Sequence, residues 1–278
     1  MSSRLYKKAP LPFVGQKRYF QKHFIEILEQ NIEGDGEGWA IVDVFGGSGL
    51  LAHTAKRIKP KARVIYNDFD GYTERLKGIP DTNRLREILH EVVGHHKKDH
   101  KLSDEENEQV RKIIKDFDGY KDLTCLNNWF IFVGRNADSL EGFYNFSYNK
   151  RLTSKNYELA DEYLEGLEIT HLSYEELMPM FSGKEKCLLV LDPPYINSNQ
   201  SHYKKPFGVV DFLKMMSLVK QPFILFSSDK TEIIEYLEYI TNEKIGNYQN
   251  FTGYKHQTID VRFNKDSVYK DNLIWLFK

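Results

Sequence analysis

The chain contains very little cysteine, with only Cys125 and Cys187 among its 278 residues. The two cysteines are far apart in the sequence, and no C-x-x-C pair occurs. A disulfide framework and a cysteine-based zinc site are therefore not expected, and no residue is predicted to be a metal ligand. A reducing compartment, the cytoplasm, is the expected location of such a chain.

Long apolar runs and an excess of one charge are also missing. No stretch reaches membrane-spanning length and the N-terminus has no signal-peptide pattern, so we expect no membrane partner. The formal net charge is −1, so any nucleic-acid surface must be local. The sequence G-x-x-x-x-G-K-[ST] is absent, which argues against a phosphate-cradling NTPase. At this length and with 41% hydrophobic residues, the chain can bury a full globular core.

Four apolar residues, 188–191, precede the sequence Asp192-Pro193-Pro194-Tyr195. The run predicts a buried strand, and the two prolines end it because proline lacks an N–H group and has a fixed φ. Asp192 then lies at the carboxyl end of a strand, where open α/β sheets bind ligands. A carboxylate and a backbone carbonyl at this point can accept the two N–H groups of an adenine amine, and a tyrosine can stack on the base. A plain strand-to-loop exit is the alternative interpretation.

A glycine-rich turn, residues 46–49, connects a predicted strand (40–45) to a predicted helix (50–58). Glycines allow a backbone to approach a ligand closely, and the N–H groups of the first helical turn point at that ligand. The next strand, 63–68, ends at Asp68, about twenty residues farther on, where an acid typically accepts ribose hydroxyls. A helix-cap or turn role for Asp68 is the alternative. Together these features predict a nucleotide-type ligand site.

Residues 71–163 differ in character from the α/β pattern on either side. Ser103 and Glu106 form a capping-box pattern, which predicts that a helix begins after Ser103. His95, His96 and His100 could indicate a metal site, but a solvated helix end is the expected explanation. Aromatic and amide residues are frequent in the later part of this block. The block is therefore predicted to be an inserted, mostly helical subdomain.

The α/β alternation resumes after residue 164 and ends in two strands that look antiparallel, which predicts a doubly wound sheet. Two segments, residues 1–22 and 146–157, carry several basic residues and no acidic one, interleaved with aromatic and amide residues. Each can be an ordinary solvated face, but the interleaving favours nucleic acid. A polar loop, residues 197–208, follows the proline pair and is a further candidate to contact a polynucleotide or to close over the site. The candidate residues are Asn149, Lys150, Arg151, Lys155, Tyr203, Lys204 and Lys205.

With these motifs in place, the chain resembles the Dam-type DNA adenine-N6 methyltransferases, which use S-adenosylmethionine. The matches, in the family's order, are residues 12–17 (Pro-Phe-Val-Gly-Gln-Lys), 43–49 (Asp-Val-Phe-Gly-Gly-Ser-Gly), 66–68 (Tyr-Asn-Asp) and 192–195 (Asp-Pro-Pro-Tyr). The resemblance implies a Rossmann-like methyltransferase sheet, formed by residues 1–70 and 164–278, with a target-recognition subdomain, 71–163, inserted into it. It implies direct transfer of a methyl group to a flipped-out adenine of double-stranded DNA.

The resemblance also implies roles for single residues. Asp192, Pro193, Pro194 and Tyr195 would form the catalytic motif. The cofactor would be held by Phe13, Gly15, Lys17, Asp43, Phe45, Gly46, Gly47, Asp68 and Asp192. A prokaryotic or phage-encoded, DNA-associated protein is implied, of the kind found in restriction–modification systems, and we expect a monomer or a weak dimer.

The chain departs from the family at residues 169–173, where members often carry an acidic residue and this sequence reads Ile-Thr-His-Leu-Ser. The insertion also lacks the signature of members that read a fixed four-base palindrome, so loose site specificity is an open alternative. Two further alternatives remain for function. The same chemistry can act on RNA or on another amine, or the chain can be a catalytically idle DNA-binding relative.

Overall fold

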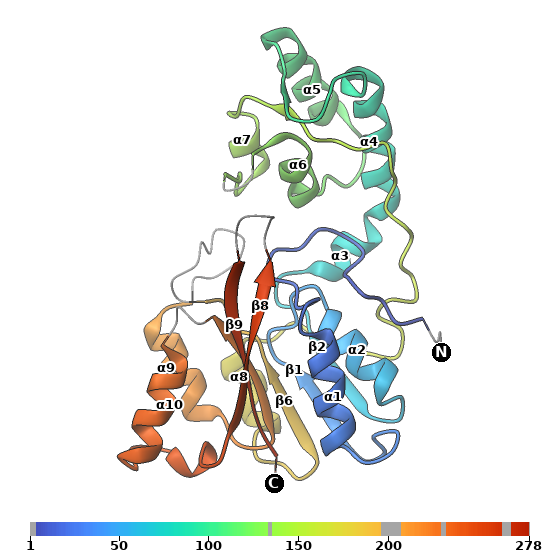
Figure 1. The fold of residues 1–278 in the computed structure, drawn as a ribbon. Coiled ribbons are helices and arrows are strands. Elements are labelled where there is room, and N and C mark those ends of the chain that lie inside the picture. The colour runs from blue at the N-terminus through green and yellow to red at the C-terminus, as the bar shows by residue number, and fades with distance from the viewer. Residues whose placement is uncertain (1–3, 133–134, 196–206, 229–231, 263–267, 278) are drawn as a thin grey trace. The chain divides into compact units, whose positions relative to one another are not determined.

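The structure is a computed structural model that describes residues 4–132, 135–195, 207–228, 232–262 and 268–277. The chain forms two compact units (Figure 1). The first unit contains Met1–Lys8, Gly15–Asp70 and Glu162–Lys278, and the second contains Ala9–Val14 and Gly71–Asp161. The segment Ala9–Val14 packs with the second unit because the N–H and C=O groups of Leu11 both bond to the Tyr72 hydroxyl.

The first unit is built on a seven-stranded sheet with the order β5-β2-β1-β6-β7-β9-β8. Its parallel strands are β1 (Ala40–Asp43), β2 (Arg63–Asn67), β5 (Glu168–Thr170), β6 (Cys187–Leu191) and β7 (Phe223–Ser228). The last two strands, β8 (Lys255–Arg262) and β9 (Val268–Leu276), run antiparallel. The order extends outward in both directions from β1 and β6. The predicted doubly wound, Rossmann-like methyltransferase sheet is thereby confirmed.

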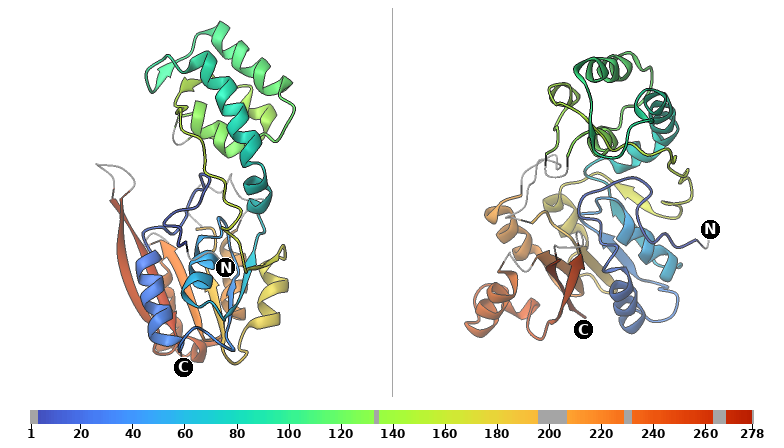
Figure 2. Two further views of the ribbon diagram at one scale, coloured as in Figure 1. Left: turned by 90° about the vertical axis from the view of Figure 1, so that its right-hand side faces the viewer. Right: turned by 45° about the horizontal axis from the view of Figure 1, so that its top comes forward.

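Helices cover both faces of this sheet (Figures 1 and 2). One face packs on α1 (Gln21–Asn31) and α2 (Leu50–Ile58), and the other packs on α8 (Tyr174–Phe181), α9 (Val209–Leu218) and α10 (Ile233–Asn242). Alternate residues of the central strands point to opposite faces of the sheet. Leu188 therefore packs in the core under α1 and α2, and Leu189 packs in the core under α8, α9 and α10. Because both faces are covered, the strands read as continuous apolar runs. A short 3-10 helix, η2 (Tyr248–Asn250), follows α10.

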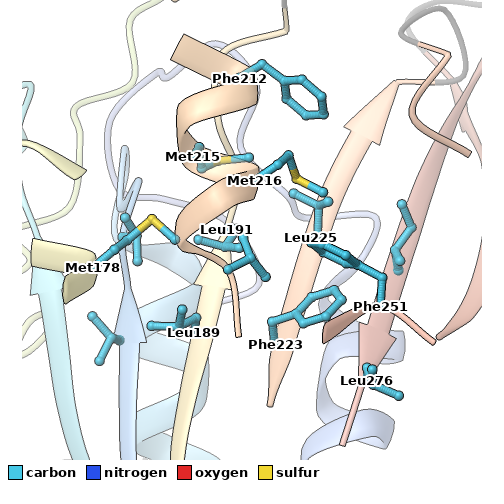
Figure 3. Packing of buried hydrophobic residues seen from close by; sticks show 14 of the residues in the cluster. Met178, Leu189, Leu191, Phe212, Met215, Met216, Phe223, Leu225, Phe251 and Leu276 are labelled. Atoms are coloured by element: carbon cyan, nitrogen blue, oxygen red, sulfur yellow. The ribbon is translucent and has the colours of Figure 1, made fainter. Parts of the chain in front are cut away.

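The core between β6 and the helices α8, α9 and α10 contains many large side chains (Figure 3). Met215 and Met216 of α9 are fully buried against Leu191 of β6 and Leu225 of β7. Flexible methionine side chains fill irregular space between layers of this kind. The packing fixes the end of β6, and therefore fixes the residue that follows it.

The second unit is mostly helical. It contains α3 (Tyr72–Lys77), α4 (Ile79–Val93), α5 (Asp104–Asp116), α6 (Leu123–Phe130) and α7 (Leu140–Phe143), with a two-stranded ladder of β3 (His100–Lys101) and β4 (Asn149–Lys150). The predicted capping box is confirmed, because Glu106 N donates to Ser103 Oγ (3.2 Å) and Ser103 N donates to Glu106 Oε2 (2.8 Å). Asp122 caps α6 and accepts from the largely buried Arg75. No helix in the described parts of the chain has both the length and the apolar character needed to cross a membrane.

Candidate active site

Two acidic side chains meet at the switch point of the sheet. Asp43 is the last residue of β1, and Asp192 directly follows β6, the strand beside it. Val44 N donates to Val190 O at 3.0 Å, which keeps the two strand ends in register. From β1 the strand order proceeds toward one edge of the sheet, and from β6 it proceeds toward the other. Doubly wound sheets bind their ligands at such a switch point.

A buried lysine from the N-terminal segment lies against Asp192. The Lys17 Nζ is 2.8 Å from Asp192 Oδ2, and it also donates to the Gly15 carbonyl at 2.9 Å. Gly15 has a φ of 82°, which a glycine adopts without strain. The same ammonium lies 5.1 Å from the centre of the Tyr195 ring. The structure therefore brings together Gly15, Lys17, Asp192 and Tyr195, all of which the sequence analysis selected.

The charges at this point do not balance. Asp43 is 1% exposed; its Oδ2 accepts from Ala52 N at 3.2 Å, whereas Oδ1 has no hydrogen-bond partner among the described residues. Burial, and then the negative charge of Asp192, raises the pKa of Asp43 to about 7. Burial also raises the pKa of Asp192, and Lys17 opposes that rise. Asp43 is buried and Asp192 is 17% exposed, and two acids beside one ammonium favour a cationic or hydrogen-bond-donating ligand. S-adenosylmethionine, the cofactor that the resemblance implies, carries both a sulfonium and an ammonium group.

Replacing Lys17 by methionine is expected to shift the pH dependence of the methyl transfer that the resemblance implies. Lys17 is the group that opposes the effect of burial on Asp192, so without its ammonium the pKa of Asp192 should rise further and the carboxylate should form only at higher pH. We expect methyl transfer at pH 7 to fall about tenfold, with the acid limb of the rate profile moved upward. Transfer rates measured from pH 6 to 9 check this. Lys22→Met removes an exposed lysine of α1 and should leave the profile in place.

The glycine turn packs closely on β2. Gly46 N donates to Asn67 O (3.2 Å), and the Tyr66 hydroxyl donates to Gly47 O (2.8 Å). A Cβ atom at Gly46 would lie 2.4 Å from the Tyr66 ring and 2.8 Å from Asn67 O. Gly47 has a φ of 48°. Glycine at these two positions is thus a structural requirement of the turn, which precedes the N-terminus of α2.

Gly46→Ala is expected to destabilise the first unit by roughly 1–3 kcal/mol, because a ring and a backbone carbonyl must both move. The thermal unfolding midpoint without ligand, together with cofactor affinity, measures the effect. Gly208→Ala is the matched control, since the nearest atom to its added Cβ is a side-chain oxygen at 3.8 Å. Equal unfolding midpoints for the two variants would contradict the close packing of the turn.

Asp68 is fully buried at the end of β2. Its Oδ1 lies 3.1 Å from the Tyr66 hydroxyl oxygen, so Asp68 and Gly47 O share the single proton of that hydroxyl. Burial together with Asp68 raises the pKa of Tyr66 well above its ordinary value, so this hydroxyl stays protonated. The His171 Nδ1 atom lies 2.8 Å from the Asp68 carbonyl oxygen. His171 follows β5, at the position where the sequence departs from the family, and it was not selected from the sequence. Its place directly after a strand is the signal that could have indicated it.

Phe45 belongs to an aromatic cluster beside the carboxyl end of β1. It stacks on Tyr174 (5.7 Å between ring centres, 30° between planes) and meets Phe207 edge-on at 5.8 Å. Tyr174 and Phe207 were also missed from the sequence. Tyr174 begins α8 directly after its cap, Ser173, so its position at this edge of the sheet is visible only once the strand order is known.

The remaining predicted residues lie elsewhere or have other contacts. Pro193 is buried and Pro194 is partly buried. Phe13 belongs to the second unit, where its ring meets Tyr72 edge-on at 5.7 Å.

The residues predicted to contact DNA fall into two groups. In the second unit, Asn149 is buried, Lys150 is paired in β4, and Lys155 is exposed. Arg151 forms an ion pair with Asp99 at 3.1 Å. Tyr203, Lys204 and Lys205 lie outside the described residues. The DNA contacts of both groups stay predictions.

Comparison with known proteins places this site in a family. No protein-family model matches the chain. The chain is 46% identical over 282 residues to a Haemophilus influenzae protein named "Putative methyltransferase", an alignment that covers 99% of this chain and 94% of the relative. Solved structures are similar at a much lower level. One from Pyrococcus horikoshii, described as a "putative RNA methyltransferase", has a TM-score of 0.41 and 10% identity, covering 98% of this chain and 91% of that one.

A second solved structure, precorrin-6y C5,15-methyltransferase from Geobacter metallireducens, has a TM-score of 0.40 and 7% identity, covering 99% of this chain and all of that one. Neither structure is similar enough to carry an argument about substrate. The Haemophilus influenzae relative is close enough over almost the whole of both chains to establish kinship. The chain therefore belongs to the family of that protein and is a methyltransferase that uses S-adenosylmethionine as its cofactor.

Proposed function

We propose that the protein methylates the exocyclic N6 amine of adenine in DNA. The observation that carries this proposal is the Asp192 carboxylate, which follows β6 at the switch point and is paired with the buried Lys17. Burial raises the pKa of Asp192 and the Lys17 ammonium opposes that rise, so Lys17 favours the ionised form, which is a strong hydrogen-bond acceptor. Asp192 leads directly into Pro193, whose carbonyl is a second acceptor, and into Tyr195. An amine with two N–H groups on a flat ring matches this set of groups.

The chain's own residues would act on the amine rather than on the methyl group. Adenine's amine is a poor nucleophile because its lone pair is delocalised into the ring. Hydrogen bonds from its two N–H groups to Asp192 and to the Pro193 carbonyl would draw the nitrogen toward a tetrahedral geometry and localise the lone pair. The Tyr195 ring would stack on a base taken out of the duplex.

S-adenosylmethionine supplies a methyl group already activated on sulfur, so alignment is the main contribution of the protein. Asp43, with its unpartnered oxygen, and the turn at Gly46 and Gly47 would hold the methionine part of the cofactor. Asp68 would hold its ribose. As the new carbon–nitrogen bond forms, the bond from the methyl carbon to the sulfonium sulfur would break and leave its electron pair on a neutral thioether. The amine would lose one proton, which Asp192 is placed to accept.

Methylation of an RNA amine is the second candidate. The groups proposed to bind the substrate recognise an amine and a flat ring. None of them is assigned to the sugar of the polynucleotide substrate, where DNA and RNA differ. The assignment to DNA rests on the resemblance of the four motifs to the Dam-type enzymes. The catalytically idle alternative is less well supported, because the acidic and glycine residues of the site are all present.

The test is to incubate the purified protein with tritiated S-adenosylmethionine and four polymers: unmethylated duplex DNA, single-stranded DNA, duplex RNA and single-stranded RNA. The products are then digested to nucleosides and separated. Label in N6-methyl-2′-deoxyadenosine supports the proposal. Label in N4-methyl-2′-deoxycytidine would overturn the choice of base, and label in a ribonucleoside would favour RNA. Cofactor binding without label in any polymer would contradict a nucleic-acid substrate.

A further inference from the structure

A second cluster of chemically active side chains lies in the second unit. His95 and His96 follow the end of α4, His100 begins β3, and Glu106 lies in the first turn of α5. We call these four residues the histidine–glutamate cluster. One ligand atom from each of His95, His96 and Glu106 lies within 4.8 Å of the others. The His100 ring stacks on the His96 ring, with 4.1 Å between centres and 14° between planes.

The backbone fixes the positions of these side chains. His96 N donates to Val93 O at 3.2 Å, and His100 N donates to Lys97 O at 3.2 Å, which makes the turn after α4 compact. Glu106 is oriented by the capping box, because its Oε2 accepts from Ser103 N. Its other oxygen, Oε1, is left to face His96 Nε2 at 2.5 Å. Three segments of the unit therefore converge through local structure that does not depend on a bound ion.

We propose that His95, His96 and Glu106 bind a divalent transition-metal ion, with zinc as the expected ion. Imidazole nitrogen and carboxylate oxygen are ordinary zinc ligands, at distances of about 2.0–2.2 Å. Two such ligands on one tetrahedral ion are about 3.3 Å apart, so His96 and Glu106 need to separate by less than about 1 Å. His95 is exposed and can reorient toward the ion. Water or His100 would complete the coordination.

Bound zinc would join the turn after α4 to the start of α5. It would replace the proton shared between His96 and Glu106 by a cation bonded to both. This inference is independent of the proposed methylation, and it differs from the expectation that these histidines form a solvated helix end. In the structure α4 ends at Val93, before any of the three histidines.

The experiment uses the full chain without a histidine tag, dialysed against EDTA and then against buffer. Zinc is titrated against a chromophoric chelator, and the absorption of the cobalt-substituted protein reports tetrahedral coordination. We expect one equivalent of zinc to bind and to raise the unfolding temperature. His95→Gln and Glu106→Gln should each weaken binding by more than the roughly 10–100-fold that loss of an outer-shell partner costs.

The two variants also test the fold separately from the metal. Glutamine at 106 can still complete the capping box, so Glu106→Gln should unfold at the same temperature as the EDTA-treated wild type. His23→Gln is the matched control, because His23 lies 3.5 Å from Glu26 without a second histidine in that pair. Failure of the wild type to bind stoichiometric zinc would overturn the proposal. Unchanged affinity in both cluster variants, or a loss equal to that of His23→Gln, would overturn it as well.

Discussion

Asp192→Asn is expected to lower the rate of methyl transfer about 1000-fold, while cofactor affinity changes less than tenfold. Asparagine keeps the shape of the side chain and one acceptor oxygen for Lys17, but it loses the negative charge. Its N–H₂ group can also occupy the position of the oxygen that would accept a hydrogen bond from the substrate amine. The expected fall in the transfer rate is of the size seen when one preorganised hydrogen-bonding group is removed from a reacting centre. The rate is measured under single-turnover conditions with tritiated cofactor, and affinity is measured by equilibrium dialysis.

The control for this experiment is Asp260→Asn, which removes an exposed carboxylate from β8 of the same unit. It should transfer at the wild-type rate. Asp192→Ala removes both acceptor oxygens and should be at least as slow as Asp192→Asn. Transfer by Asp192→Asn at the wild-type rate would remove Asp192 from the chemistry. A loss confined to cofactor affinity would move its role from the amine to the cofactor.

Asp43→Asn should stabilise the free protein and yet weaken cofactor binding at least about 100-fold. Burial raises the pKa of Asp43 to about 7 from an ordinary value of 3.8. Above pH 7 the folded protein therefore holds a charge that the unfolded chain exposes to water, at a cost on the order of 4 kcal/mol. As the pH falls through 7, the folded state takes up a proton that the unfolded state does not, so wild-type stability rises until about pH 4.

Asparagine is neutral at every pH and removes this cost. If about half of it is recovered, the unfolding midpoint at pH 8 should rise by roughly 4–8 °C. At pH 5 the folded wild-type carboxyl is protonated while the unfolded one is still ionised, so the gap between the two midpoints should be smaller than at pH 8, and it should close only near pH 4. Calorimetry at both pH values measures stability, and titration with S-adenosylmethionine at pH 8 measures affinity. Asp35→Asn, on the surface, is the control for both.

Asp43→Asn is expected to increase stability and to decrease cofactor affinity, and these opposite effects distinguish two explanations of the buried carboxylate. If Asp43 holds the cofactor's cationic end, its carboxylate lowers the stability of the free protein and raises the affinity for the cofactor. Wild-type affinity for the cofactor then falls as the pH drops below 7. A stabilised Asp43→Asn variant that binds the cofactor as tightly as the wild type would exclude that role. A variant that is less stable at pH 8 would show that the carboxylate has a structural partner instead.

Local sequence predicted most of the elements of the first unit. Apolar runs of the right length became β1, β2, β6 and β7, because strands covered on both faces need apolar residues throughout. The start of α5 was predicted from Ser103 and Glu106, since a capping box is a contact between residues three apart. The end of β6 before Asp192 followed from the proline pair, whereas β1 ends at Asp43 and β2 at Asn67, two residues and one residue earlier than predicted.

Contacts between distant segments could not be predicted in this way. Nothing near Lys17 in the sequence indicates that its ammonium meets Asp192, because that pair depends on the path of the chain over the sheet. The packing of Ala9–Val14 with the second unit depends on two hydrogen bonds between Leu11 and Tyr72, one donated by the Leu11 N–H and one by the Tyr72 hydroxyl. The meeting of His96 with Glu106 depends on how the turn after α4 closes, which the composition of the histidine run does not determine.

The pairing of β1 also has a consequence for how the molecule folds. Ala40 of β1 pairs with Arg63 of β2, a near neighbour in the sequence, and with Cys187 of β6, which follows the entire second unit. During synthesis β1 therefore has one open edge until β6 leaves the ribosome, and closing that long loop is slow. The second unit has time to fold first. Asp43 and Asp192 come together only when β6 docks, so the energetically costly step that brings the partly buried Asp192 beside the buried Asp43 falls late in folding, when Lys17 can already be in place.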